Sequence, residues 1–295
     1  MRRWAELSLV ANTVVWGSTF VVVKNVLGEI SAILFLALRF SLATVALAIL
    51  FRKPLTVRGA WKGAAPGVLV GVFLFLGYFF QTQGLRFTSA AKSAFLTGMA
   101  SVLAPLFAST VYGIKPRILE LFGLLAAVVG LGLMTLPGAS GSGALGSINR
   151  GDLLTLVCAA AFAAHIVSLG HYSKELQFEA ISVAQVGTAA VLALALFPWA
   201  ETPRVHWQPS VLWAILVTGL LATAMAFTVQ AWAQKFTTST RTALIYMLEP
   251  VVAWMTSYLL AGEGLTPLGT AGAALILGGV MLVELKPANS RQHPK

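Results

Sequence analysis

Residues 84–98 read GLRFTSAAKSAFLTG, and residues 233–247 read AQKFTTSTRTALIYM. The two stretches lie 149 positions apart, and this offset aligns 84–136 with 233–285 without a gap. Phe87-Thr88 then falls on Phe236-Thr237, and Lys92 falls on Arg241. Small and apolar residues coincide along the rest of the alignment, namely Ala94 with Ala243, Val102 with Val251, Ala104 with Ala253, Gly113 with Gly262, Gly123 with Gly272 and Gly130 with Gly279. Such an internal repeat predicts that one structural unit occurs twice.

The composition around this repeat is that of a membrane protein. Of the 295 residues, 58% are hydrophobic and 10% are charged, whereas soluble domains carry about 25% charged residues. The mean hydropathy is +0.84. These values exclude a soluble globular enzyme, a disordered protein and a fibrous protein. The apolar runs are too long for barrel strands and lack their alternation, so they predict helices.

We predict ten transmembrane helices, at 6–25, 31–51, 62–84, 88–111, 117–136, 152–171, 178–198, 210–233, 239–261 and 266–285. Each repeat then holds five helices, and because five is odd the second copy enters the membrane from the opposite side. The predicted fold is an all-α polytopic membrane protein with two inverted five-helix repeats, as in many secondary transporters. The predicted divisions are a first repeat at 1–137, a Gly/Ser/Ala linker at 138–150, a second repeat at 151–286 and a tail at 287–295.

Three glycines give the third helix a narrow face. Gly63, Gly67 and Gly71 recur at every fourth position. Without side chains on this face, a second helix is expected to approach closely. The pattern concerns packing and carries no information on substrate.

The positive charge of the chain is a topology signal. The net charge is +10, and with the N-terminus inside, 14 of the 20 Lys and Arg residues lie in inner segments. Five lie in outer segments, and Arg39 lies within a helix. The positive-inside rule therefore predicts a multi-pass plasma (inner) membrane protein with both termini in the cytoplasm. Because topology explains the basic charge, no nucleic-acid partner is expected.

Two charged residues are expected at membrane depth, where charge is costly and usually faces a partner or water. Arg39 and Glu249 lie within one helical turn of the same depth in the predicted helices. They form a structural ion pair, or one of them acts in transport: Glu249 takes up a proton, or Arg39 binds a substrate carboxylate. These hypotheses stay open. Pro250 conflicts with the hydrogen bond to the Tyr246 carbonyl, which indicates a kink or a carbonyl left for a ligand.

Other polar residues also fall on helix faces that point into the bundle. Packing between helices is the alternative explanation for each of them, and Lys92 and Arg241 are interpreted as anchors that extend to the membrane surface. The complete set of candidate residues for substrate binding or ion coupling is Asn12, Trp16, Thr19, Arg39, Tyr78, Gln81, Thr97, His165, Gln230, Tyr246 and Glu249.

The order of several motifs resembles the EamA family of the drug/metabolite transporter superfamily. These are Trp16-Gly17-Ser18-Thr19-Phe20, Leu38-Arg39-Phe40, Thr88 to Gly98, Gln230, Thr240-Arg241-Thr242-Ala243-Leu244, Leu248-Glu249-Pro250-Val251, Gly262-Glu263 and Gly272. The resemblance covers about 6–285 and implies ten helices in two inverted repeats and the export of amino acids or other small metabolites. Two departures are Pro105, which aligns with Trp254, and Gly113-Ile114-Lys115, which lacks the glutamate of Gly262-Glu263.

The predicted function is therefore secondary transport, with a small-molecule substrate, the lipid bilayer as surroundings and protons as one candidate coupling ion. The favoured hypothesis is an exporter of amino acids or similar small metabolites that works by alternating access. The alternatives are a drug or sugar-metabolite transporter of the same fold and a membrane-embedded enzyme. The sequence contains no G-x-x-x-x-G-K-[ST], H-E-x-x-H or G-x-S-x-G motif, so we expect no ATP-driven motor, catalytic residue, metal or cofactor.

Overall fold

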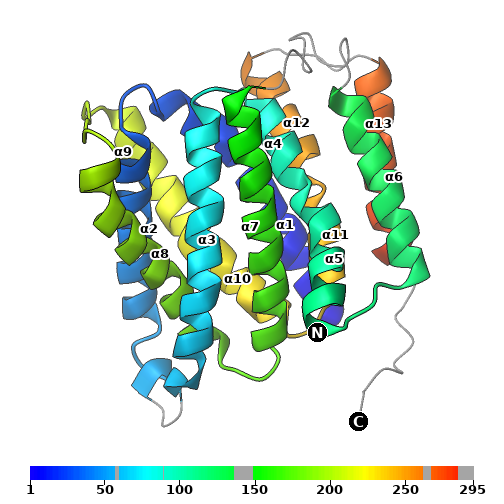
Figure 1. The fold of residues 1–295 in the computed structure, drawn as a ribbon, viewed down its shortest axis with the longest axis horizontal. Coiled ribbons are helices and arrows are strands. Elements are labelled where there is room, and N and C mark those ends of the chain that lie inside the picture. Colours follow the sequence, from blue (N-terminus) through cyan, green and yellow to red (C-terminus); the bar gives the residue numbers. More distant parts are fainter. Residues whose placement is uncertain (57–59, 89, 136–148, 262–266, 285–295) are drawn as a thin grey trace.

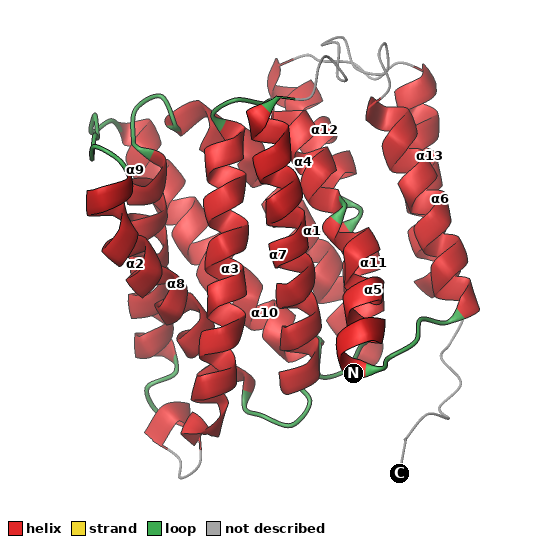
Figure 2. Cartoon of the chain, viewed as in Figure 1, coloured by secondary structure: helices red, strands yellow, loops and turns green. Residues whose placement is uncertain are grey.

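The computed structural model describes residues 1–56, 60–88, 90–135, 149–261 and 267–284, and within these ranges the only β structure is one isolated bridge between Ile30 and Val205. Figure 2 shows helices joined by short loops. The elements are α1 (Arg2–Val26), α2 (Ala32–Leu50), η1 (Pro54–Thr56), η2 (Ala60–Gly63), α3 (Ala64–Leu85), α4 (Ala90–Gly98), α5 (Ala100–Tyr112), α6 (Ile118–Thr135), α7 (Arg150–Tyr172), α8 (Phe178–Ala200), α9 (Pro209–Leu216), η3 (Val217–Met225), α10 (Ala226–Ala233), α11 (Ser239–Tyr246), α12 (Glu249–Ala261) and α13 (Pro267–Glu284).

The predicted fold class is confirmed, and each of the ten predicted ranges is occupied by helix. Three of those ranges are interrupted. The range 88–111 divides at Met99 into α4 and α5, and 239–261 divides at Met247 and Leu248 into α11 and α12. The range 210–233 contains the π-helical segment η3 between α9 and α10. The predicted linker, except for its last two residues, and the predicted tail lie outside the described residues.

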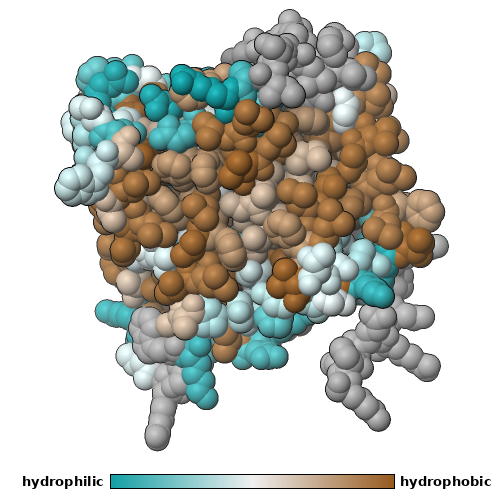
Figure 3. All heavy atoms as spheres, in the orientation of Figure 1, coloured by the Kyte–Doolittle hydropathy of each residue, from teal (hydrophilic) through white to brown (hydrophobic). Residues whose placement is uncertain are grey.

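The outer surface is apolar where it would contact lipid. Seven described helices are long and apolar enough to cross a membrane, and two shorter apolar helices lie at Ile118–Leu133 and Pro267–Leu282. Large apolar side chains such as Val45, Leu125 and Val191 are exposed on this surface. Figure 3 shows the apolar surface as a broad belt, with hydrophilic residues toward its two ends.

The glycine face of the third helix packs as predicted. A Cβ placed on Gly67 would lie 2.5 Å from the Ala184 side chain, and one on Gly71 would lie 2.5 Å from the Gln185 carbonyl oxygen. Both neighbours belong to α8. The backbones of α3 and α8 therefore approach more closely than residues with side chains would allow.

The repeat is also visible in the bounds and contacts of the helices. Both ends of α13 lie 149 positions after the corresponding ends of α6. A Cβ on Gly130 would lie 2.4 Å from the Gly272 carbonyl oxygen, and a Cβ on Gly279 would lie 2.5 Å from that of Gly123. Because Gly123 aligns with Gly272 and Gly130 with Gly279, the same contact occurs twice across one helix pair. Figure 1 shows α6 and α13 side by side at one edge of the bundle.

We expect Gly279→Ala to lower the free energy of unfolding by about 1–3 kcal/mol, because the added methyl group would overlap the α6 backbone. Gly278→Ala is the matched control, since a Cβ there meets no described atom within 4 Å. Thermal unfolding of the purified protein in detergent measures both effects. Identical melting of the two variants and the parent would contradict the close crossing of α6 and α13.

Candidate functional site

A central cavity lies where the interrupted helices meet. The volume that the centre of a water molecule can occupy in it is about 60 Å³. This is room for roughly four to six waters. Helix interruptions border it, because Gly98 and Ala100 flank the break after α4 while Tyr246 and Glu249 flank the break before α12. Irregular backbone at membrane depth is tolerated where it lines a cavity, and the position of these breaks beside the cavity agrees with this rule.

The π-helical segment η3 supplies acceptors to two predicted site residues. The Ala222 carbonyl accepts hydrogen bonds from Trp16 Nε1 at 2.8 Å and from Arg39 Nη2 at 3.3 Å. Thr223 Oγ1 accepts from Arg39 Nε at 2.7 Å and donates to the Thr218 carbonyl at 2.8 Å. A π-helical turn is wider than an α-helical one and is common at functional sites. Here η3 fixes the orientation of Trp16 and Arg39.

Arg39 is buried and oriented by neutral partners. Besides the bonds to η3, its Nη2 donates to the Tyr78 hydroxyl at 3.1 Å, and its Cζ lies 4.3 Å from the centre of the Tyr78 ring. Within the described ranges, Arg39 forms no ion pair with Glu249, and its Nη1 makes no hydrogen bond. The open question of an Arg39–Glu249 pair is therefore answered in the negative for this conformation. Arg39 lines the cavity with one nitrogen not engaged by the described chain.

Glu249 is the other charged residue in the cavity wall. It is the first residue of α12, where the positive end of the helix dipole favours a carboxylate. Pro250 follows in the first turn, where its missing N–H costs no helical hydrogen bond. Among the described residues the Glu249 carboxylate has no hydrogen-bond or ion-pair partner. A carboxylate in the cavity wall is thus available to a ligand.

Aromatic rings form much of the remaining wall. The Trp16 ring centre lies 4.9 Å from that of Tyr246 and 5.1 Å from that of Phe227, and Tyr78 packs edge-on against Phe162 at 5.2 Å. Phe162 and Phe227 were not among the predicted site residues, because phenylalanine in an apolar helix has the same pattern as a lipid-facing residue. Phe227 lies three positions before Gln230 and therefore on the same face of the helix. This shared face was the sequence signal that could have selected Phe227.

The amide, hydroxyl and imidazole candidates are distributed around the same wall. Gln81 Nε2 donates to Thr97 Oγ1 at 3.2 Å, and Gln230 Nε2 donates to Gln234 at 3.3 Å. His165 Nε2 lies 2.9 Å from Gln185 Oε1. The predicted residues that line the cavity are Trp16, Thr19, Arg39, Tyr78, Gln81, Thr97, His165, Gln230, Tyr246 and Glu249.

Asn12 is the predicted site residue that lies away from the cavity lining. Its Nδ2 donates to the Ala226 carbonyl at 2.7 Å, just beyond the end of η3. The side chain is buried, so its observed contact joins α1 to the start of α10. The role of every candidate residue in substrate binding or ion coupling stays a prediction.

Comparison with known proteins identifies the family. Residues 3–136 and 149–285 each match the model of the EamA-like transporter family. The chain belongs to this family. An uncharacterized transporter of Archaeoglobus fulgidus is 35% identical over 285 residues, which cover 97% of this chain and 87% of that protein. The uncharacterized transporter YoaV of Bacillus subtilis is 24% identical, with 94% and 95% covered.

Two further similarities extend across most of this EamA-like transporter. A chloroplastic WAT1-related protein of Arabidopsis thaliana is 26% identical, with 93% of this chain and 68% of that protein covered. A crystal structure superposes with a TM-score of 0.76 at 20% identity over 97% of this chain and 98% of that one, which supports the fold alone. The protein is a multi-pass membrane protein of a transporter family, and the relatives from Archaeoglobus fulgidus and Bacillus subtilis carry transporter names.

The two charged residues of the cavity should differ in their effect on stability. Arg39→Met should lower the free energy of unfolding by about 1.5–3 kcal/mol for each hydrogen bond lost, because Tyr78 and Thr223 lose a charged donor. Glu249→Gln should not lower it, because the carboxylate has no described partner and burial of a charge is costly. Thermal unfolding in detergent compares the two. Equal destabilisation would show that Glu249 has a structural partner that this conformation lacks.

Proposed function

We propose that this protein is a secondary transporter that exports amino acids or similarly small metabolites by alternating access, with both termini in the cytoplasm and no catalytic activity. The supporting observation is one cavity lined by a carboxylate without a described partner and by a guanidinium with one unengaged nitrogen. A zwitterion carries one ammonium and one carboxylate, which complement these two groups. Charged groups of this kind at membrane depth are typical of substrate and ion pathways.

Each group would bind a different end of the substrate. Glu249 would accept hydrogen bonds from the ammonium, beside the rings of Trp16 and Tyr246, which also attract cations. Arg39 would donate from Nη1 to the carboxylate, since η3 and Tyr78 already hold the rest of the guanidinium. Gln81 and Gln230, which align in the repeat, would provide neutral hydrogen-bonding groups.

The size of the cavity favours a small metabolite over a drug or a sugar derivative. Room for roughly four to six waters fits a small amino acid in the present conformation. Larger ligands would require the helices that border the breaks to separate. Energy for export would come from the gradient of the substrate itself or from protons, with Glu249 and His165 as the candidate coupling residues.

Flux measurements with the purified full-length chain in proteoliposomes test the proposal. We expect saturable uptake of a labelled amino-acid mixture above that of protein-free vesicles. Glu249→Gln should reduce the initial rate more than about tenfold, the loss expected for one charged hydrogen bond to the substrate. Arg39→Lys should raise the KM by about the same factor, because lysine cannot reproduce the guanidinium geometry.

Two comparisons sharpen this experiment. Flux that collapses with the pH gradient would establish proton coupling, and flux that ignores the gradient would establish facilitated exchange. The exposed residue Glu29 provides a control, because Glu29→Gln removes a carboxylate at the surface and should leave the flux unchanged. Full flux in Glu249→Gln, or no amino-acid flux in the parent, would overturn the proposed substrate class.

A further inference from the structure

A buried carboxylate on α7 is held by two residues that precede and begin α4. Asp152 Oδ2 lies 2.6 Å from Lys92 Nζ, and Asp152 Oδ1 accepts from Thr88 Oγ1 at 2.9 Å. Asp152 is 2% exposed, and Asn149 N also donates to it at 2.9 Å. We call Thr88, Lys92 and Asp152 the Asp152 clamp.

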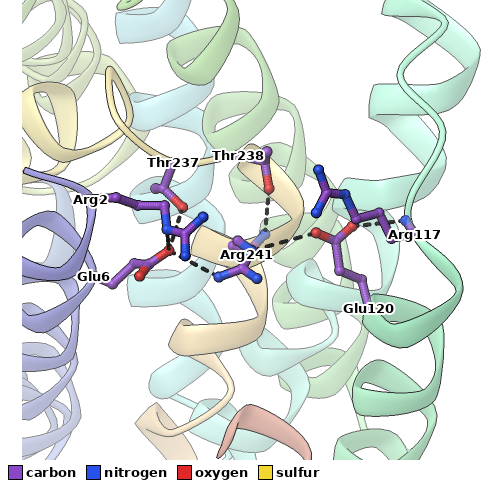
Figure 4. A network of polar contacts seen from close by, with 7 residues as sticks. All are labelled: Arg2, Glu6, Arg117, Glu120, Thr237, Thr238 and Arg241. Carbon is purple, nitrogen blue, oxygen red and sulfur yellow. Dashed lines mark hydrogen bonds and ion pairs between the residues drawn. The ribbon is translucent and has the colours of Figure 1, made fainter. Parts of the chain in front are cut away.

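A second buried carboxylate, on α1, is held in the same way at the start of α11. Glu6 Oε1 lies 3.1 Å from Arg241 Nη1 and accepts from Thr237 Oγ1 at 3.3 Å. Glu6 is 6% exposed and Arg241 is 4% exposed. Figure 4 shows Arg241 between Glu6 on α1 and a further carboxylate on α6. We call Thr237, Arg241 and Glu6 the Glu6 clamp.

The two clamps are equivalent under the repeat. Thr88 aligns with Thr237 and Lys92 aligns with Arg241, each 149 positions apart. In each clamp, a threonine and the cation four positions after it belong to one of the two segments that match the family model, 3–136 and 149–285. They bind a carboxylate that lies near the start of the first helix of the other segment. The interpretation of Lys92 and Arg241 as surface anchors was therefore wrong, because both side chains are directed to carboxylates within the bundle.

The clamps lie at opposite ends of α1, with the cavity between them. Glu6 lies near the start of the helix, and Lys24 near its end donates to the Thr88 carbonyl at 2.8 Å, beside Asp152. Eighteen residues separate Glu6 from Lys24, which corresponds to about 27 Å along a helix. Trp16 and Thr19 line the cavity between these points. Each clamp thus joins the two matched segments on one side of the substrate cavity.

We infer that the Asp152 clamp and the Glu6 clamp are the two gates of the transport cycle, one for each side of the membrane. The inference rests on the proposed alternating access. Opening the cavity to either side requires the two segments to separate there, and in each case the charged contact between them must break. The present conformation, with both clamps formed, is closed at both contacts.

Arg241 and Glu6 each have a further charged neighbour. Arg241 Nε also lies 3.7 Å from Glu120 Oε1 on α6, and Arg2 Nε lies 3.4 Å from Glu6 Oε1. The position that aligns with Glu120 is Gly269, which has no carboxylate. The Glu6 clamp therefore contains a second carboxylate, on α6, at a position where the repeat has a glycine.

Accessibility of the cavity from each side tests the inference. In a Cys158→Ala background, Ala100→Cys places a single thiol in the cavity wall. A membrane-impermeant maleimide is applied to one side at a time, in intact cells and in inside-out vesicles. Lys92→Met should raise the labelling rate roughly tenfold from the side of the Asp152 clamp only, and Arg241→Met should do so from the opposite side only.

The chain provides its own matched controls. Lys92→Arg and Arg241→Lys keep a positive charge in each clamp, so both should change the labelling rate less than the corresponding methionine variants. Glu29→Gln removes an exposed carboxylate that contacts His206 beyond the same end of α1 as the Asp152 clamp, and it should have no effect. If loss of a cation prevents folding, Thr88→Val and Thr237→Val remove one neutral hydrogen bond each and should shift labelling about threefold in the same directions.

The outcomes separate this inference from the proposed function. One-sided increases that follow the mutated clamp support the gates, even if no amino acid is transported. Labelling that rises from both sides together, or from neither side, overturns the gates, even if amino-acid flux is intact.

Discussion

The structure depends on one constraint of the bilayer: every backbone carbonyl at membrane depth needs a hydrogen-bond partner. A continuous α-helix meets this need by itself, and at the breaks shorter backbone bonds continue, such as Met99 N to the Leu96 carbonyl and Leu248 N to the Ile245 carbonyl. At η3 side chains add to the backbone bonds, since Trp16 and Arg39 both donate to the Ala222 carbonyl. These bonds place an indole and a guanidinium in the cavity wall, so irregular backbone and candidate site form one arrangement.

Much of the fold follows from patterns that act over short distances in the sequence. Apolar runs give the spans, glycine spacing gives the α3–α8 contact, and the repeat gives the matching bounds of α6 and α13. The helix breaks were harder to predict. Pro250 indicated a disturbance near Tyr246, but Pro105 lies inside α5, several residues after the break at Met99. Nothing in 217–225 distinguishes a π-helix from an α-helix, because that choice depends on donors from α1 and α2.

The candidate site shows the same division between local and distant information. Polar residues on inward helix faces, such as Tyr78 and Gln230, could be selected from single-helix periodicity. Thr223 could not, because its importance comes from its contact with Arg39. Lys92 and Arg241 were misinterpreted for a related reason. The carboxylate partner of Lys92 lies 60 positions away, and that of Arg241 lies 235 positions away. Only the tertiary fold brings each carboxylate close to the start of the helix that carries its cation.

The extra carboxylate of Glu120 has a kinetic consequence. Because a passive carrier obeys detailed balance, an asymmetry in its resting contacts cannot set the direction of net flow, which the external gradients alone decide. It does set how long the carrier dwells in each conformation. Arg241 contacts carboxylates from both α1 and α6, so the conformational step that frees it must break both contacts. Loss of the Glu120 carboxylate should therefore shorten the time spent in the conformation with the Glu6 clamp closed, while the external gradients still decide the direction of net flow.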